Sequence, residues 1–122
     1  MILGLEAPVG QAVSAASEGV QIYRAVGEDE MAHVSSTGDY GSSPNLSGKY
    51  FALTEQGARN FAGASINAGD KMTITSVRIP RSVFDQGFQF HDPGAFGAGP
   101  SVYFQQDFLT NLYSSMTPIT SH

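Results

Sequence analysis

The sequence has no cysteine and no tryptophan, and it has six basic residues against eleven acidic ones. Without cysteine the chain cannot form disulfides, thiolate metal sites or a thiol nucleophile. The six cations are scattered along the chain, at Arg24, Lys49, Arg59, Lys71, Arg78 and Arg81. Because nucleic-acid binders neutralise several phosphates with clustered lysines and arginines, binding to a nucleic acid as a scaffold is disfavoured.

Long apolar runs are missing as well. No stretch of about eighteen apolar residues predicts a membrane span, and no basic segment followed by an apolar core predicts a signal peptide. We therefore expect no membrane partner, and we expect any export to use a route other than a signal peptide. The 122 residues fit one compact domain. Residues 1–19 are rich in Gly, Ala and Ser, which predicts a linker or N-terminal arm before a domain at residues 20–122.

Short alternating segments indicate the secondary structure of this domain. Alternation and β-branched content predict strands at residues 20–26, 49–53, 71–80, 88–90 and 101–105. Helices are predicted at residues 27–38 and 55–65, the second with Thr54 as its N-cap, and one helical turn at 81–87. Residues 106–115 are helical or extended, and the tail that follows has no strong signal. Because regular βαβ spacing is missing, we expect an α+β fold with a mostly antiparallel sheet and short helices.

Arg24 lies on the apolar face of its predicted strand, together with Ile22 and Val26. A guanidinium in such a place needs an anionic partner, because its desolvation costs several kcal/mol. A phosphate or carboxylate of a ligand would satisfy it. The alternatives are an ion pair with one of the eleven acids, or a side chain that extends to water.

Three aromatic residues flank the turn from a predicted strand into the helix capped by Thr54, two in the strand and one in the helix. Tyr50 and Phe51 point to opposite faces of their strand, so one can enter the core while the other lines a cleft. Phe61 lies about two turns into the helix and can approach that strand. Two such rings can hold a flat heterocycle between them. The alternative is that both rings belong to the core.

These residues carry a resemblance to a known family. "GKYFA" at residues 48–52, followed by a helix with "RNFA", resembles the nicotinamide-pocket segment of the ADP-ribosyltransferase superfamily, particularly its poly(ADP-ribose) polymerase and diphtheria-toxin-like branch. "IYRAV" at residues 22–26 resembles the first strand of that fold. The arrangement of strands, loops and helix that resembles this superfamily covers roughly residues 20–112. More narrowly, the segments at residues 23–40, 48–58, 79–85 and 99–104 are similar to C-terminal toxin domains of bacterial polymorphic toxins, of the Rhs and contact-dependent inhibition types.

The resemblance implies a split β-sheet fold and NAD as a substrate. It places Tyr50 and Phe61 against the nicotinamide, with Phe51 in the same pocket, and it assigns Arg24 to the ribose or diphosphate. Thr54 matches a polar position of the Ser-Thr-Ser motif in the arginine-dependent branch. There it would orient a side chain and cap the helix.

The catalytic glutamate of that family is missing from this chain. The family places it at the start of the last strand, near Ser101, and the sequence has no glutamate after Glu55. Alternation puts Ser101 and Gln105 on the cleft face, so the candidate catalytic residues are Arg24, Ser101 and Gln105. A Gln amide can bond a ribose hydroxyl, but it carries no charge and cannot act as a base. Asp107 is the nearby acid and joins the Gln105 face if the strand continues.

The function that the resemblance implies is an antibacterial mono-ADP-ribosyltransferase toxin. It would leave its producer by a contact-dependent or type VI-like route and act in the cytoplasm of a rival cell. The target would be a macromolecule, preferably a protein such as the translation factor elongation factor Tu. The producer would need a cognate immunity protein of basic or mixed charge. Two alternatives stay open: a non-catalytic binding module of the same fold, and an NAD glycohydrolase.

No metal site is expected. The histidines His33, His91 and His122 lack the spacing of metal ligands. Asp92, Pro93 and Gly94 form a turn signal. The glycine-rich stretches lack the strand and motif context of a phosphate-binding loop.

Overall fold

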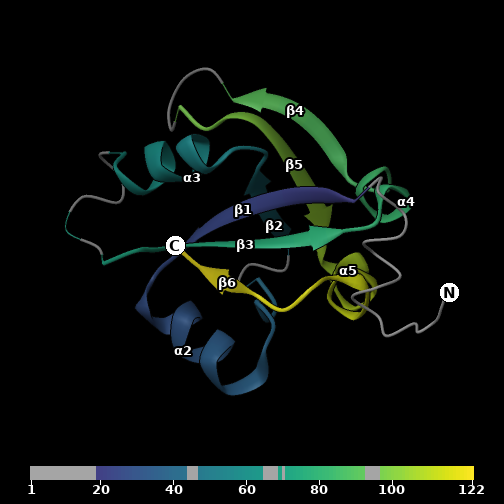
Figure 1. Cartoon of the computed structure of the whole chain (residues 1–122), viewed down its shortest axis with the longest axis horizontal. Helices are drawn as coiled ribbons and strands as arrows, with labels where there is room; N and C mark the ends of the chain where they lie inside the picture. Colours follow the sequence, from purple (N-terminus) through teal and green to yellow (C-terminus); the bar gives the residue numbers. More distant parts are fainter. Residues whose placement is uncertain (1–18, 44–46, 65–68, 70, 93–96) are drawn as a thin grey trace, which may run out of the picture.

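The computed structural model describes residues 19–43, 47–64, 69, 71–92 and 97–122 (Figure 1). The predicted N-terminal arm, up to residue 18, therefore lies outside the described residues. The elements in chain order are β1 (Val20–Val26), α2 (Glu28–Thr37), β2 (Gly48–Ala52), α3 (Glu55–Ala62), β3 (Thr73–Ile79), α4 (Arg81–Phe84), β4 (Phe88–Asp92), β5 (Gly99–Gln105), the 3₁₀ turn η2 (Gln106–Phe108), α5 (Leu109–Ser115) and β6 (Thr120–Ser121).

The strands form one antiparallel sheet in the order β4-β5-β2-β1-β3-β6. This confirms the predicted α+β class with an antiparallel sheet. The pairing is uneven, because β1 and β3 pair along their whole length while β1 and β2 pair only through Tyr23 and Ala52. The sheet thus consists of two three-stranded halves, β4-β5-β2 and β1-β3-β6, that share one residue pair.

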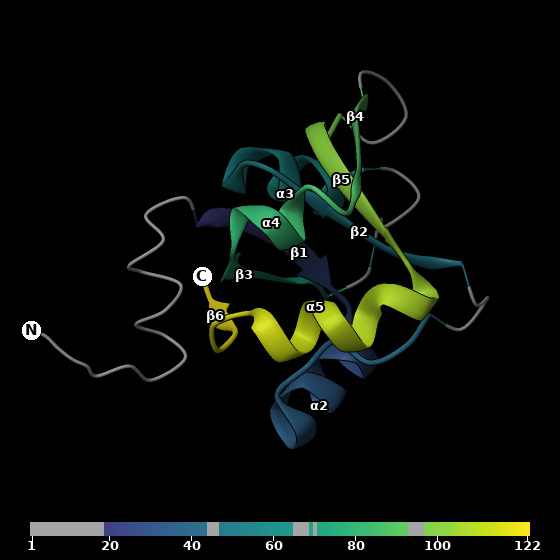
Figure 2. The same cartoon turned by 90° about the vertical axis from the view of Figure 1, so that its right-hand side faces the viewer.

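Helices cover both faces of this sheet. Figure 2 shows α3 on the opposite side of β1 from α2 and α5. The larger core lies on the side of the sheet that carries α2, α4 and α5. Its fully buried side chains include Ile22, Phe51 and Leu112. The smaller core lies under α3, and its buried residues are the three alanines Ala25, Ala52 and Ala58 together with Ile74. The α3 side of the sheet therefore has less side-chain volume to fill the space above the strands.

The local signals for the helix ends are confirmed. The hydroxyl of Thr54 accepts a hydrogen bond from the backbone N–H of Gly57 at 2.9 Å, which caps α3. The predicted stop of α2 at Gly38 is also present, because this glycine takes a φ of 87°, which side-chain-bearing residues rarely adopt. Three acidic residues fill the first turn of α2, where they face the positive end of the helix dipole.

The C-terminal region decides between two stated alternatives and adds one strand that was not expected. Residues 106–115 are helical, as η2 and α5, and the tail adds the short strand β6. Its pairs with β3 are Thr75 with Ser121 and Ser76 with Thr120. A strand of two residues is too short to show alternation, so only the exposed edge of β3 explains its formation. Among the helices of the described residues, none has the length and apolar content that crossing a membrane requires.

Candidate functional site

A cavity of about 510 Å³ lies where the two halves of the sheet meet. Its walls come from β1, β2, α3, β4 and β5, and they include Arg24, Tyr50 and Phe61. The two strands at the centre, β1 and β2, pair through a single residue pair, Tyr23 and Ala52. The structure thus brings Arg24, Tyr50 and Phe61 to the lining of one open space.

Alternation along β2 separates Tyr50 from Phe51, as predicted. Phe51 is 2% exposed and meets the rings of Tyr40 and Phe104 edge-on in the larger core. Tyr50 is 56% exposed on the α3 side of the sheet. Its ring lies 4.6 Å from the ring of Tyr103, measured between centroids. Phe51 therefore anchors the strand in the core and also borders the cavity, while Tyr50 lines the same cavity and is exposed to solvent.

Small side chains leave the cavity open between its aromatic walls. Four alanines contribute to the lining: Ala25, Ala52, Ala58 and Ala98. Helix α3 approaches the start of β5 closely, because a Cβ on Gly57 would lie 2.2 Å from the carbonyl oxygen of Ala98. Glycine at this position is what allows α3 to carry Phe61 to the cavity at this height above the sheet.

Arg24 is already engaged within the protein. Its Nε and Nη2 donate to the two carboxylate oxygens of Glu30 at 2.7 and 2.9 Å. Its Nη1 donates to the backbone carbonyl of Tyr50 at 2.8 Å, and the guanidinium carbon lies 5.8 Å from the centre of the Phe51 ring. Of the alternatives open from the sequence, the ion pair with an acid is the one present. Arg24 therefore connects β1, α2 and β2 where the two halves of the sheet meet.

Glu30 also pairs with Lys49, whose Nζ lies 3.5 Å from a carboxylate oxygen of Glu30. Burial raises the pKa of the Glu30 carboxyl, but the hydrogen bond and charge of Arg24, with the charge of Lys49, outweigh it and hold that pKa below its usual value. Lys49 is 4% exposed. Burial and the charge of Arg24 lower the pKa of its ammonium, and Glu30 opposes that effect. The three side chains form a largely buried group with two cations and one anion.

The other predicted site residues divide between the cavity and its outside. Ser101 lines the cavity, is 3% exposed, and donates its hydroxyl to the carbonyl of Gly99. Gln105 shares its face of β5 but is exposed at the end of the strand, and it lies outside the cavity lining. Thr54 is exposed as the α3 cap and also lies outside the lining. Ser101 is thus the predicted β5 residue that can reach a ligand here.

The acids near β5 do not lie as the sequence suggested. The strand ends at Gln105, so Asp107 falls in η2, is exposed, and does not continue the Gln105 face. Asp92, expected only as part of a turn, is the last residue of β4 and lines the cavity. The signal for it was weak, because the alternation of Phe88, Phe90 and Asp92 becomes informative only once β4 is known to pair with β5.

Two serines from the loop before β2 also border the cavity. Ser43 and Ser47 line the cavity, while residues 44–46 lie outside the described part of the chain. Side-chain hydrogen bonds fasten both ends of the loop. The backbone N–H of Ser43 donates to Gln106 at 2.9 Å, and the hydroxyl of Tyr103 donates to the carbonyl of Ser47. Ser43 and Ser47, the described ends of this loop, are therefore fixed at the edge of the cavity.

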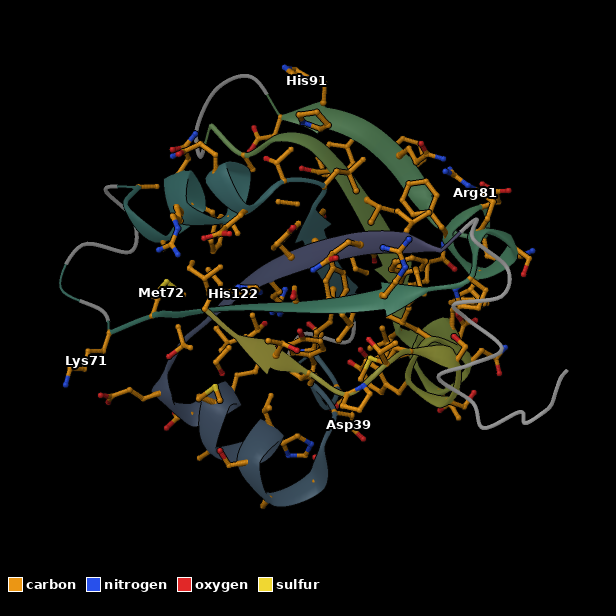
Figure 3. The ribbon with its side chains drawn as sticks, in the orientation of Figure 1. Asp39, Lys71, Met72, Arg81, His91 and His122 are labelled. Atoms are coloured by element: carbon orange, nitrogen blue, oxygen red, sulfur yellow. The ribbon has the colours of Figure 1, made fainter. Side chains whose placement is uncertain are left out.

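The histidines serve local contacts. Figure 3 shows His91 pointing away from the sheet, while His122 lies beside β3. The ring of His122 is hydrogen-bonded to the Ser76 hydroxyl at 2.7 Å, and that of His33 to Asp39 at 3.1 Å. Within the described ranges, His, Asp and Glu side chains form no group of three that could hold a metal ion.

Comparison of the chain with protein-family models, with curated proteins and with solved structures finds no match.

Proposed function

We propose that this domain binds NAD in the 510 Å³ cavity and transfers ADP-ribose to a macromolecular target, as a mono-ADP-ribosyltransferase of the toxin type. The observation that carries the proposal is the convergence of Arg24, Tyr50 and Phe61 on one cavity. In the family that the chain resembles, the two aromatic positions contact the nicotinamide ring, and the arginine position contacts the ribose or diphosphate of NAD. The two halves of the sheet share one residue pair, and this division supports the proposal of an ADP-ribosyltransferase-like split sheet.

The cavity suits a flat, partly polar ring. Its volume lies in the range of roughly 300–1,000 Å³ that small-molecule sites occupy. Tyr50 and Phe61 offer aromatic surfaces, and offset stacking contributes about 0.5–1.5 kcal/mol per ring pair beyond area burial. The alanines between the rings leave room for the nicotinamide. Ser101 adds a hydroxyl at the same wall, which can bond the carboxamide or a ribose oxygen.

Arg24 acts in this proposal mainly as a positioning residue. Its contacts with Glu30 and the Tyr50 carbonyl use three of the five N–H groups of a guanidinium. The remaining two can donate to a ribose or diphosphate oxygen that enters the cavity. Because Arg24 holds the backbone of Tyr50, its loss displaces the stacking ring as well as a donor.

The charge of the chain favours a protein as the acceptor. The formal net charge of −5 repels RNA, and the few cations are paired with acids or scattered along the chain. We propose a translation factor of a rival bacterium, such as elongation factor Tu, as the target class. A cognate immunity protein of basic or mixed charge would complement the acidic surface.

Transfer of label from NAD to a bacterial lysate tests the proposal. The wild-type domain and two aromatic variants are incubated with NAD labelled in its adenylate part. We expect label on a protein with the wild type, and a loss of at least tenfold with Tyr50→Ala, because the stacking wall is removed. Phe88→Ala is the matched control, since Phe88 is 67% exposed on β4 and lies outside the cavity lining. It should transfer label like the wild type.

The possible outcomes separate the alternatives. Free ADP-ribose without labelled macromolecule would make water the acceptor and identify a glycohydrolase. A folded domain that neither binds NAD nor moves label would contradict the proposal and leave a binding module.

A further inference from the structure

Asp92 supplies a carboxylate to the cavity that the resemblance did not provide. It is the only acid among the described residues that line this cavity. We propose that Asp92 is the catalytic carboxylate of the site, and this inference rests on the proposed transferase function. The family's glutamate, which this chain lacks, belongs to the last strand, whereas Asp92 lies on the neighbouring strand β4.

The sheet register places Asp92 close to Ser101, one of the predicted catalytic residues. Phe90 pairs with Ser101 and Asp92 pairs with Gly99, so Asp92 and Ser101 are diagonal neighbours across β4 and β5. Side chains at such positions lie roughly 7–8 Å apart and share one face. Asp92 also follows Phe90 by two residues, and both line the cavity. The carboxylate therefore lies on the same face of β4 as a ring of the proposed pocket.

The two other acids in this region are unsuited to the role. Both carboxylate oxygens of Glu30 accept hydrogen bonds from Arg24, and Lys49 neutralises it further. Glu30 also lies outside the lining of this cavity. Asp107 is exposed in η2. Asp92, in contrast, forms no ion pair with the residues that the structure describes, so its charge is available to a ligand.

Such a charge is what the transfer step requires. The C1′–N bond of the nicotinamide riboside breaks, and its electron pair leaves with nicotinamide, which becomes neutral. The positive charge moves to C1′ and the ring oxygen of the ribose, where a fixed anion stabilises it. The acceptor nucleophile then forms a bond to C1′ and loses its proton, which the carboxylate of Asp92 can accept and pass to solvent. NAD⁺ and the acceptor thus give ADP-ribosylated acceptor, nicotinamide and a proton.

The test measures chemistry and binding separately in Asp92→Asn, which keeps the side-chain shape and removes the charge. Label transfer is timed at saturating NAD with release of nicotinamide, and affinity for NAD is measured by calorimetry. We expect the transfer rate to fall about 100-fold while the affinity stays close to the wild type. Asp107→Asn is the control and should keep the wild-type rate. Asp92→Glu, which restores a carboxylate, should recover part of the rate and excludes misfolding as the cause.

Each other outcome decides against the inference. A wild-type rate in Asp92→Asn would overturn it while leaving the proposed function intact. Equal losses of rate and affinity would make Asp92 a binding residue rather than a catalytic one. Absence of NAD binding by the wild-type domain would instead contradict the proposed function itself.

Discussion

Glu30 holds the side chains of two neighbouring strands through one carboxylate. Arg24 of β1 bonds it through two nitrogens, and Lys49 of β2 approaches to 3.5 Å. Their side chains are largely withdrawn from water, so removing the anion leaves two cations without compensation. Because β1 and β2 share only one residue pair, this ionic group and the bond from Arg24 to Tyr50 reinforce the junction of the sheet halves.

Acid should weaken the fold through this group. The pKa of Glu30 lies below its ordinary value of 4.5, so the unfolded chain takes up a proton before the folded chain does. The stabilisation is fully present above pH 4.5 and is lost as the pH falls through the lowered pKa. We expect the free energy of unfolding, measured with urea from pH 7 to pH 3, to decline. In Glu30→Gln it should be about 2 kcal/mol lower at pH 7 and should decline less steeply.

Glu55→Gln is the matched control for that measurement. Glu55 pairs with Arg59 four residues on, but both side chains are exposed. Its loss should cost less than about 1 kcal/mol at pH 7 and should leave the acid-dependent decline as in the wild type. An unchanged pH dependence in Glu30→Gln would show that the ionic group does not stabilise the junction.

Single residues were predictable from the sequence where a local rule decides their place. Strand alternation separated Tyr50 from Phe51, and a Thr before a helix indicated a cap. Other positions depend on which elements pack together. The sequence did not identify the partner of Arg24, and for Asp92 it indicated only a turn.

Helix α3 is positioned by a glycine rather than by large side chains. A Cβ on Gly57 would meet the carbonyl oxygen of Ala98 at 2.2 Å, so any side chain moves the helix away from the start of β5. In an ordinary helix, alanine is more favourable than glycine by about 1 kcal/mol. The close approach reverses that preference here.

We expect Gly57→Ala to lower the free energy of unfolding by about 1–3 kcal/mol, as overpacked sites do. Because α3 carries Phe61 to the cavity, the same variant should weaken NAD binding. Thermal unfolding and calorimetry measure the two effects. Gly63→Ala is the control, since the nearest atom to its added Cβ is 3.5 Å away, and it should match or slightly exceed the wild-type stability. Equal behaviour of the two variants would contradict this account of α3.

Most elements could be predicted because their residues alternate or carry caps, and their ends lie near the predicted ones. The exception is β6, which forms only because the edge of β3 is present to pair with it. The choice between helix and extended structure for residues 106–115 is also settled by packing, since Leu109 and Leu112 are buried in the larger core. Such elements depend on tertiary contacts that a local pattern does not contain.

At the scale of the whole molecule, the central feature is a sheet whose two halves meet at one residue pair, with a cavity at that junction. The larger core stabilises the α2, α4 and α5 side, and the alanine-rich packing beneath α3 leaves the other side open. Aromatic rings from β2, α3 and β4 gather at this opening. The antiparallel α+β class followed from the sequence, but the position of the cavity depends on a strand order that no local pattern specifies.

The most direct test is an NMR titration of the folded domain with NAD, following the aromatic side chains and alanine methyl groups. We predict saturable shifts concentrated at Tyr50, Phe61 and Ala58, with Phe88 unaffected on the exposed part of β4. Shifts confined to other surfaces, or none at millimolar NAD, would contradict the assignment of this cavity as the nicotinamide site.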